Sequence, residues 1–388
     1  LTKRPGLKWI SNLGTGTTYD TSKWFYIART STEKYIGCIK PAPNGGTGDI
    51  DIWNATTGAA CTVTYGTGAQ AYLTGSRLNY DILTVQDTSI ISNNLITVAK
   101  IADPTFNTTR KATLLLEGSS ISTTYTITID STTITVTTDS DDSYDDTLTK
   151  LKTAIDNEGI SGLTVTKYPS ILHLTSNSSF TITAKGGDFN DRLTYFQDQV
   201  DNISQLPVES FNGHIVKIIN TAQTAKDTYW VKFVAYDGTS GPGYWDETVD
   251  PGKSVGLDNT TMPHELVNTS ANTFVFQKIT WDERKAGDDV TNKHPSFVGL
   301  KIQQAFFHNN RLGFLSEDNV SMSQSKDFYN FYHTSAQTQT DADPVDLNCS
   351  TIRPAALHGV IPTNQGLALF SKNQQFLLSA ADGILTPT

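Results

Sequence analysis

The sequence predicts a mainly β protein with a minor α+β part, and three observations lead to this fold class. Its 388 residues include 57 Thr, 31 Ser, 15 Tyr, 17 Phe and 6 Trp, and Thr and the aromatic residues favour strands. Short apolar runs with turn residues between them recur roughly every ten residues. A helical repeat of apolar residues stands out in only one segment. The apolar content of 37% excludes a disordered chain, and the length allows two or three domains at roughly 150 residues each.

The first part of the chain consists of short β runs with tight turns. No connection between these runs is long enough for a crossover helix, which excludes a parallel α/β arrangement. We therefore expect an antiparallel meander, a sandwich or a propeller. The expected pairs are Phe25–Arg29 with Tyr35–Ile39, Asp49–Trp53 with Cys61–Tyr65, and Tyr80–Val85 with Ser89–Ile91.

The pattern changes near residue 110. Tyr125, Ile127 and Ile129 alternate with Thr, which predicts a hairpin with one wet, Thr-lined face. The helix follows at Asp146–Asn157, where apolar residues share one stripe. Strand patterns resume after the helix, so this stretch is interpreted as a small β-β-α-β-β unit.

Short β runs return from Phe274 and continue to the end of the chain. Two similar outer regions thus flank a different middle, which indicates one β domain that carries an insertion. Because its hydroxyl-rich strands leave one face wet, we expect the middle to project as a module and to contact a neighbour. The Gly- and Pro-rich stretch Asp237–Gly243 is interpreted as a solvated connection between module and host, with a binding loop as the alternative.

Charge and composition disfavour several classes of protein. The chain has 29 Lys and Arg against 39 Asp and Glu, a net charge of −10, which argues against a broad surface for nucleic acid or anionic lipid. No segment approaches about 18 consecutive apolar residues, so no membrane insertion is expected. Cys38, Cys61 and Cys349 lie far apart, which fits neither a disulfide framework nor a metal knuckle, and they are interpreted as small buried residues.

The acidic run from Asp139 to Asp146 allows two interpretations. Its side chains occupy alternate positions of a calcium-binding loop, but Tyr144 and Lys150 stand where such a loop needs Gly and Glu. A loop that caps the following helix is favoured, because acidic groups stabilise the positive end of a helix.

No catalytic, cofactor-binding or metal-binding residues are predicted. His264 and Glu265 resemble the start of a zinc-protease motif, but Asn268 stands in place of the second His. Carboxylate pairs for glycoside hydrolysis meet only in the fold, so the sequence leaves them open. The aromatic residues Trp24, Trp53, Trp230, Trp245 and Trp281 are interpreted mostly as core, with sugar platforms as the alternative.

Motifs from Met262 onward closely resemble, in sequence and in order, the tail tubular protein B family, which forms the tail nozzle of short-tailed phages (podoviruses of the Autographiviridae type). Three earlier segments, Lys3–Pro5, Asp227–Val231 and Trp245–Thr248, look like the same family in the same order. The later motifs are Met262–Leu266, His294–Gly299, Phe306–Ser316, Ser323–Phe331, Asp341–Asp346 and Gly383–Pro387.

The resemblance implies a structural, non-enzymatic subunit of the virion tail that needs no cofactor. It implies a hexameric ring of identical chains, through which genomic DNA passes without specific binding when the virus enters its host. The implied partners are the upper tail ring protein, tail tubular protein A, and the tail fibres. The implied fold is a partial β-propeller of residues 1–110 and 256–388, incomplete at its C-terminus. Residues 111–255 then form an inserted β-β-α-β-β type domain that docks fibre or ring.

The alternative function is a phage-tail carbohydrate-active enzyme or a host-glycan-binding module. It requires a cleft with two convergent carboxylates or an exposed aromatic platform. Within the structural interpretation, Arg311 lies in an alternating strand and should pair with Asp327 or another acid of the following loop. The last runs, Leu367–Ser371 and Gln375–Ser379, should present unpaired strand edges.

Overall fold

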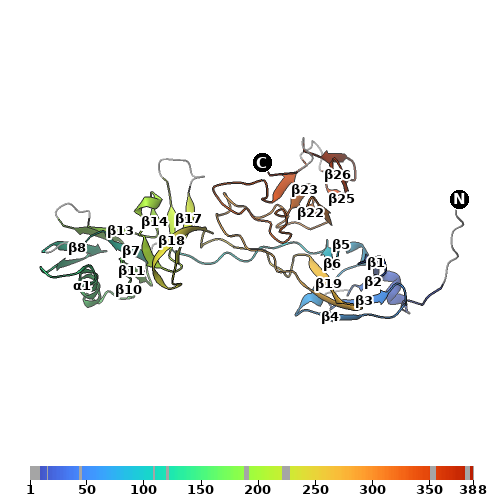
Figure 1. The fold of residues 1–388 in the computed structure, drawn as a ribbon, viewed down its shortest axis with the longest axis horizontal. Helices are drawn as coiled ribbons and strands as arrows, with labels where there is room; N and C mark the ends of the chain where they lie inside the picture. Colours follow the sequence, from blue (N-terminus) through green and yellow to red (C-terminus); the bar gives the residue numbers. More distant parts are fainter. Residues whose placement is uncertain are drawn as a thin grey trace.

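The computed structural model is elongated, with its sheets in successive groups (Figure 1). It describes residues 9–14, 16–42, 46–107, 110–118, 122–187, 192–220, 228–349, 355–380 and 385–387. Within these ranges the protein is mainly β and has one α-helix, so this part of the predicted fold class is confirmed. The motif residues Lys3–Pro5, Asp227 and Gly383–Ile384 lie outside the described residues. Short 3-10 helices are η1 (Thr17–Thr21), η3 (Ala69–Tyr72), η4 (Arg77–Asn79) and η6 (Ile203–Gln205).

The first sheet is antiparallel and follows the chain in the order β1-β2-β3. Its strands are β1 (Lys23–Ala28), β2 (Lys34–Lys40) and β3 (Asp49–Asn54). One face is apolar and buried, with Ile27, Ile39, Ile50 and Ile52 each at most 2% exposed. The predicted hairpin of Phe25–Arg29 with Tyr35–Ile39 is confirmed by the pairing of β1 with β2.

The second sheet joins strands from two distant parts of the chain, in the order β4-β20-β19-β6-β5. The expected β5–β6 hairpin is confirmed. The expected pairing of Asp49–Trp53 with Cys61–Tyr65 is present only at its start, where Trp53 forms a bridge with Ala60 and the Cys61 N–H donates to the Ile52 carbonyl oxygen at 2.8 Å. Beyond that point it is wrong, because β4 pairs in parallel with β20. Val63 and Tyr65 of β4 thereby pack on the same core as Phe274 and Phe276. The strands are β4 (Thr62–Tyr65), β5 (Tyr80–Val85), β6 (Thr88–Asn93), β19 (His264–Ser270) and β20 (Thr273–Lys278).

The middle region contains the helix α1 (Tyr144–Asn157) and two sheets, in the orders β10-β11-β7-β13 and β12-β8-β9. Leu148, Leu151 and Ile155 of α1 are buried in their shared core, and each such side chain stabilises the fold by about 1.5–3 kcal/mol. The helix begins two residues before the predicted Asp146, because Ser143 is the residue that caps it. The strands are β7 (Lys111–Leu116), β8 (Thr124–Ile129), β9 (Thr132–Thr137), β10 (Leu163–Lys167), β11 (Ile171–Ser176), β12 (Ile182–Gly186) and β13 (Leu193–Phe196).

The predicted Thr-rich hairpin is confirmed as β8 and β9. Tyr125, Ile127 and Ile129 point into the core. On the other face, Thr hydroxyls pair across the strands, with Oγ1–Oγ1 distances of 3.1 Å for Thr124–Thr137 and 3.3 Å for Thr128–Thr133.

A five-stranded sheet follows in the order β14-β16-β17-β18-β15. It corrects the interpretation of Asp237–Gly243, which forms the turn of the β17–β18 hairpin and the first residues of β18 and is no connection to another region. Gly243 is required there, because a Cβ atom would lie 2.2 Å from the carbonyl oxygen of Val234. The strands are β14 (Gln199–Val200), β15 (Glu209–Phe211), β16 (Ile215–Ile218), β17 (Tyr229–Ala235) and β18 (Ser240–Thr248).

The last part of the described chain forms two sheets, in the orders β21-β22-β23-β24 and β25-β26-β27. Phe297, Phe314 and Phe331 pack ring against ring between the family-like motifs. The expectation that Leu367–Ser371 presents an unpaired edge is wrong, because β26 pairs on both sides. Of the two predicted runs, only Gln375–Ser379 contains an outer strand of this sheet, β27. The strands are β21 (Gln304–His308), β22 (Arg311–Ser316), β23 (Asn319–Met322), β24 (Val345–Asn348), β25 (Leu357–Thr363), β26 (Gly366–Ser371) and β27 (Gln375–Leu378).

Candidate functional sites

A cleft of about 420 Å³ lies between the edge strands β3 and β4, and we call it the β3–β4 cleft. It contains two carboxylates, those of Asp49 and Asp51, from alternate positions of β3. The sequence did not single out these two acids, because it placed β4 directly against β3. The lining residues are Gly14, Tyr19, Asp49, Ile50, Asp51, Ile52, Trp53, Ala60, Cys61, Val63 and Tyr65.

Lys40 bridges the two carboxylates of the β3–β4 cleft. Its Nζ lies 2.8 Å from Asp49 Oδ2 and 2.7 Å from Asp51 Oδ2. Burial by itself would raise the pKa of Asp49, but hydrogen bonds from Lys40 and from the Tyr65 hydroxyl outweigh it, and the pKa is lowered. A glycosidase needs a carboxylic acid whose pKa is raised so that it can donate a proton. With Asp49 ionised and Asp51 paired to the same ammonium, the cleft offers no such acid.

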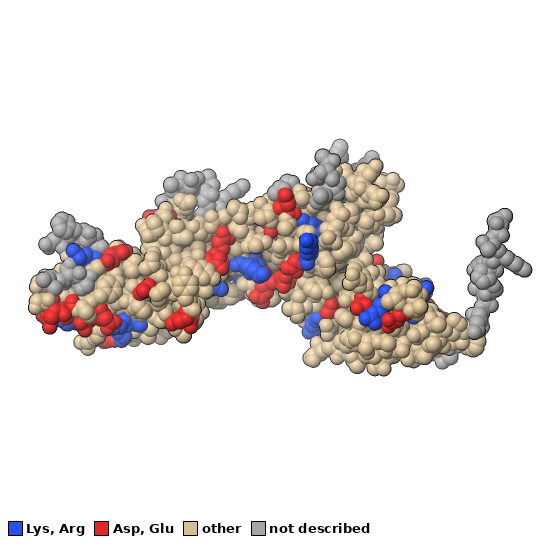
Figure 2. All heavy atoms as spheres, viewed as in Figure 1, with Lys and Arg blue, Asp and Glu red and all other residues tan. Residues whose placement is uncertain are grey.

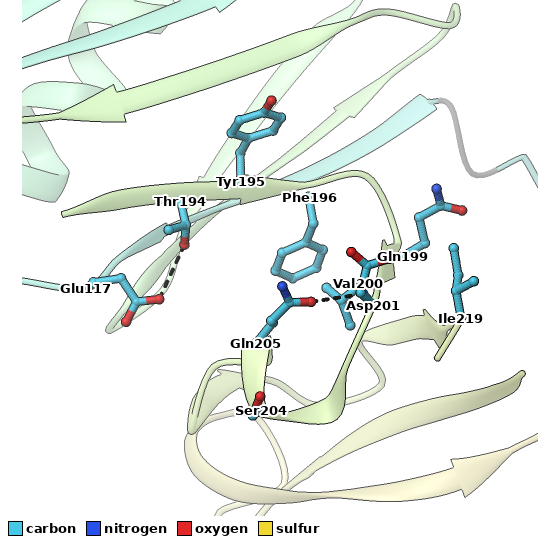
Figure 3. Close-up of a pocket in the computed structure, with 10 residues that line it drawn as sticks. All are labelled: Glu117, Thr194, Tyr195, Phe196, Gln199, Val200, Asp201, Ser204, Gln205 and Ile219. Carbon is cyan, nitrogen blue, oxygen red and sulfur yellow. Dashed lines mark hydrogen bonds between the residues drawn. The ribbon is translucent and has the colours of Figure 1, made fainter. Parts of the chain in front are cut away.

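A second cleft, of about 480 Å³, opens between β13 and the loop that carries η6 (Figure 3). Polar side chains of this cleft form hydrogen bonds within the protein. Thr194 donates to Glu117 Oε1 at 3.3 Å, and Gln205 Oε1 accepts from the backbone N–H of Asp201 at 2.9 Å. Figure 3 shows Phe196 pointing toward Gln205 while Tyr195 points to the other side of β13. Among these lining residues no nucleophile is hydrogen-bonded to a base. The lining is Glu117, Thr194, Tyr195, Phe196, Gln199, Val200, Asp201, Ser204, Gln205 and Ile219.

The fold also brings together two histidines that are far apart in the sequence, His173 and His214, whose ring centroids are 5.3 Å apart. Thr113 Oγ1 lies 3.4 Å from His173 Nδ1 and 3.3 Å from His214 Nε2. Ser210 Oγ lies 2.8 Å from His214 Nδ1. Ser210 and His214 are 0% and 1% exposed, so this serine–histidine pair cannot reach a substrate and its role is structural. No sequence spacing could have identified it.

The acidic run caps the helix, as the favoured interpretation predicts. Ser143 Oγ accepts from the backbone N–H of Asp146, whose carboxylate accepts from the backbone N–H of Ser143 at 3.0 Å. Lys150 Nζ lies 2.6 Å from both Asp139 and Asp142. The ammonium group of Lys150 thus lies between the carboxylates where a calcium ion would have to bind. In the described ranges no group of three or more His, Cys, Asp or Glu side chains is arranged to hold a metal ion.

The remaining sequence-derived candidates lie mainly in the core. Trp53, Trp230 and Trp281 are buried and Trp245 is half-buried, but Trp24 is 38% exposed. Cys38 is buried, whereas Cys61 and Cys349 are only half-buried. His264, from the zinc-protease-like pair, stacks on Tyr72 with ring centroids 4.1 Å apart. Of the described helices, none has the length and apolarity to cross a membrane.

Arg311 is buried as expected, but its expected ion pair with Asp327 is wrong. Its guanidinium donates to backbone carbonyl oxygens at 2.6–3.1 Å, and the Asp327 carboxyl lies beside Asp282 instead. Peptide carbonyls satisfy the buried donors, and the charge of the nearby buried Asp343 carboxylate partly offsets the effect of burial on the Arg311 pKa. The accepting residues are Ser323, Asp341, Ala342 and Asp343.

Comparison with known proteins supports the family-like motifs. The model of the bacteriophage nozzle protein family matches residues 1–388. The tail tubular protein gp12 of Escherichia phage T7 is 34% identical over 230 residues. This match covers 58% of the chain and 28% of the T7 protein, so the chain spans well under two thirds of that relative. The chain belongs to the bacteriophage nozzle protein family, and its place is in the tail of the phage virion.

Proposed function

We propose that the chain is part of a subunit of a hexameric ring at the distal end of the tail, through which DNA leaves the virion and on which tail fibres dock. The observation that carries this proposal is the family match along all 388 residues. The whole protein's assembly remains part of the proposal, since the matched stretch is 28% of the T7 relative.

The charge distribution supports a conduit that does not hold DNA. Figure 2 shows small groups of Lys and Arg next to acidic side chains on the visible face, and no broad basic area. Arg29 pairs with Glu33 and Asp87, and Lys167 pairs with Asp145. Since phosphate contacts by unpaired cations supply most nonspecific affinity for DNA, a surface of this kind lets DNA slide. A net charge of −10 per chain acts in the same direction.

We further propose that residues 111–255 form an inserted domain that docks tail fibres or tail tubular protein A, and that residues 1–110 and 256–388 form part of a propeller. Two features support this division. The sheet β4-β20-β19-β6-β5 is assembled from both outer regions, and α1 with strands β7–β18 lies in a separate group of elements (Figure 1).

We propose no enzymatic activity for this part of the protein. The convergent carboxylates of the β3–β4 cleft share the ammonium of Lys40, and the serine–histidine pair is fully buried. Of the two carbohydrate alternatives, we therefore retain glycan binding and not glycan hydrolysis.

The proposal is tested with the full-length protein, alone and with the upper tail ring protein. We expect native mass spectrometry to give a six-subunit species and electron microscopy to show a ring with a central channel. Binding to duplex DNA should be weak and should depend little on salt. The conduit would be contradicted by a protein that stays monomeric when the upper tail ring protein is present. A tight complex with DNA that dissociates at high salt would also contradict it.

A further inference from the structure

We propose that the β3–β4 cleft, together with the aromatic face beside it, is a binding site for a neutral saccharide. The site includes one cleft, one exposed aromatic surface and a fixed set of hydrogen-bonding groups. It does not depend on the ring or the channel of the proposed function.

The register of the first sheet places the relevant side chains on one face. Trp24 pairs with Cys38, which pairs with Asp51, so these three residues point to the same side. Lys40 and Asp49 form the neighbouring row of that face. The opposite face is the buried isoleucine core, so this face points outward.

Tyr19 of η1 lies over this outward face and organises it. Its hydroxyl donates to Asp51 Oδ2 at 2.7 Å, and its ring centroid lies 6.0 Å from that of Trp24 and 6.1 Å from that of Trp53. Trp24 and Trp53 stack at 5.6 Å with an angle of 21°. Gly14, at φ 78°, lets the chain pass the Tyr19 ring, because a Cβ there would lie 2.4 Å from a ring carbon.

The aromatic surface remains accessible on the outer side. Trp24 is 38% exposed, and Tyr26, two residues further along β1, is 54% exposed. Large amphipathic rings of this kind offer a flat apolar area to which the C–H faces of a sugar ring can pack. Recognition sites combine such apolar surface with a few well-placed polar groups.

The polar groups of the cleft suit hydroxyl donors. A carboxylate has about four lone-pair positions, and the bonds from Lys40, Tyr19 and Tyr65 leave further positions free on Asp49 and Asp51. The same bonds hold both carboxylates in place before a ligand arrives, which reduces the entropy cost of binding.

The charge of the site selects a neutral ligand. Two carboxylates repel phosphate, sulfate and acidic sugars. A cationic ligand would compete with Lys40, which already lies within 2.8 Å of both. An apolar ligand would bury the carboxylates without satisfying them. A neutral ligand with many hydroxyls avoids all three problems. Because the cleft offers no carboxylic acid with a raised pKa to donate a proton, we expect the site to bind a saccharide without hydrolysing it.

The test uses the full-length protein with maltotriose, cellotriose and triacetylchitotriose as neutral probes and 3′-sialyllactose as the charged one. We expect at least one neutral probe to give saturable calorimetric binding with a Kd on the order of 1 mM or tighter, and the sialylated probe to bind at least tenfold more weakly. Trp24→Ala and Asp51→Asn should each weaken that binding at least tenfold. The control Tyr236→Ala, which removes an aromatic side chain 75% exposed in the turn between β17 and β18, should leave it unchanged.

Three results would overturn the proposal: no binding of any neutral probe at about 10 mM, equal binding of the sialylated probe, or release of new reducing ends. Because Trp24 stacks on Trp53 and its Nε1–H donates to the Tyr19 carbonyl oxygen at 3.2 Å, Trp24→Ala should melt at a lower temperature than the parent, and its binding is measured while it is still folded. If Trp24→Ala unfolds, Asp51→Asn still decides the question. An intact ring that binds none of the neutral probes would refute the saccharide site and leave the conduit standing.

Discussion

The imidazole rings of His173 and His214 meet edge to face beside the hydroxyl of Thr113, with centroids 5.3 Å apart and ring planes at 64°, where the sheets that contain β11 and β15 adjoin. Burial lowers the pKa of His173 to about 4 and that of His214 well below its usual value, and the positive charge of Lys111 acts in the same direction. Both rings are therefore neutral near pH 7.

We expect this neutral pair to destabilise the middle region in acid. The unfolded state takes up protons below about pH 6.5 and the folded state does so only near pH 4, so stability is complete above pH 6.5 and is lost as the pH falls. His173 alone accounts for about 3 kcal/mol. NMR of ¹³C-labelled histidine, assigned with His173→Gln and His214→Gln, should show neither ring titrating above pH 5. A midpoint near 6.5 for either ring would contradict the burial argument.

Asp198 is expected to have the opposite pH dependence. Its carboxyl is 1% exposed and has no hydrogen-bond partner among the described residues, and burial raises its pKa to about 7. Its contribution is complete below about pH 3.8 and is lost as the pH rises to 7, because the unfolded state ionises in this range while the folded state keeps its proton. Asp198→Asn should raise the free energy of unfolding at pH 8 by up to about 4 kcal/mol. Asn also tolerates the left-handed backbone at this position, where φ is 51°.

Chemical denaturation at pH 8 and pH 4 measures this effect. The gain from Asp198→Asn should be present at pH 8 and nearly absent at pH 4. Asp201→Asn, an exposed change just after β14, is the control and should be neutral at both pH values. A gain of the same size at both pH values would show that folding does not shift the pKa of the Asp198 carboxyl.

The Arg311 guanidinium should stabilise the loop that follows β23. Arg311→Ala leaves buried carbonyl oxygens without donors, and we expect a loss of about 2–4 kcal/mol and poorer ring assembly. Arg311→Lys should recover only part of the loss, since one ammonium cannot reproduce the planar set of donors. Arg77→Ala, a surface arginine bonded to a single carbonyl, should cost much less. Normal stability of Arg311→Ala, with a defect only in DNA ejection, would place Arg311 at the channel.

The capping of α1 predicts a metal-independent helix start. Ser143→Ala removes one acceptor for the backbone N–H of Asp146 and should lower stability by about 1 kcal/mol in thermal melting. Ser143→Asp retains an acceptor and should restore most of the loss. A chelator should not move the melting temperature of the parent protein. A loss of several degrees with chelator would revive the calcium interpretation of Asp139–Asp146.

Local patterns in the sequence were sufficient for the local elements. The alternation of Tyr125, Ile127 and Ile129 with Thr identified the β8–β9 hairpin, because a strand's two faces are encoded by neighbouring residues. The single amphipathic stripe located α1 to within two residues, and the acidic run was correctly interpreted as its cap. The family motifs in the sequence indicated the place of the protein in the virion.

Pairing over long distances was beyond the sequence patterns. β4 resembles the second half of a hairpin with β3, yet the larger apolar surface of Phe274 and Phe276 draws it to β20. The Arg311 guanidinium donates to backbone carbonyl oxygens, which every residue type has, so no sequence pattern could indicate these partners. The β3–β4 cleft was missed for the same reason, since it exists only because β4 leaves β3.

The mixed origin of the sheet β4-β20-β19-β6-β5 has a consequence for how the protein is made. When a ribosome has completed β6, the strand that pairs with its free side, β19, is still roughly 170 residues from synthesis, which at about 5–20 residues per second takes on the order of ten seconds or more. During this interval Ile91 lacks its later core partners Leu266, Phe274 and Phe276, and the core around Ile90 lacks all its members from residue 257 onward. The nascent chain is then at its most prone to aggregation, and the yield of assembled tails should depend on host chaperones that act during translation.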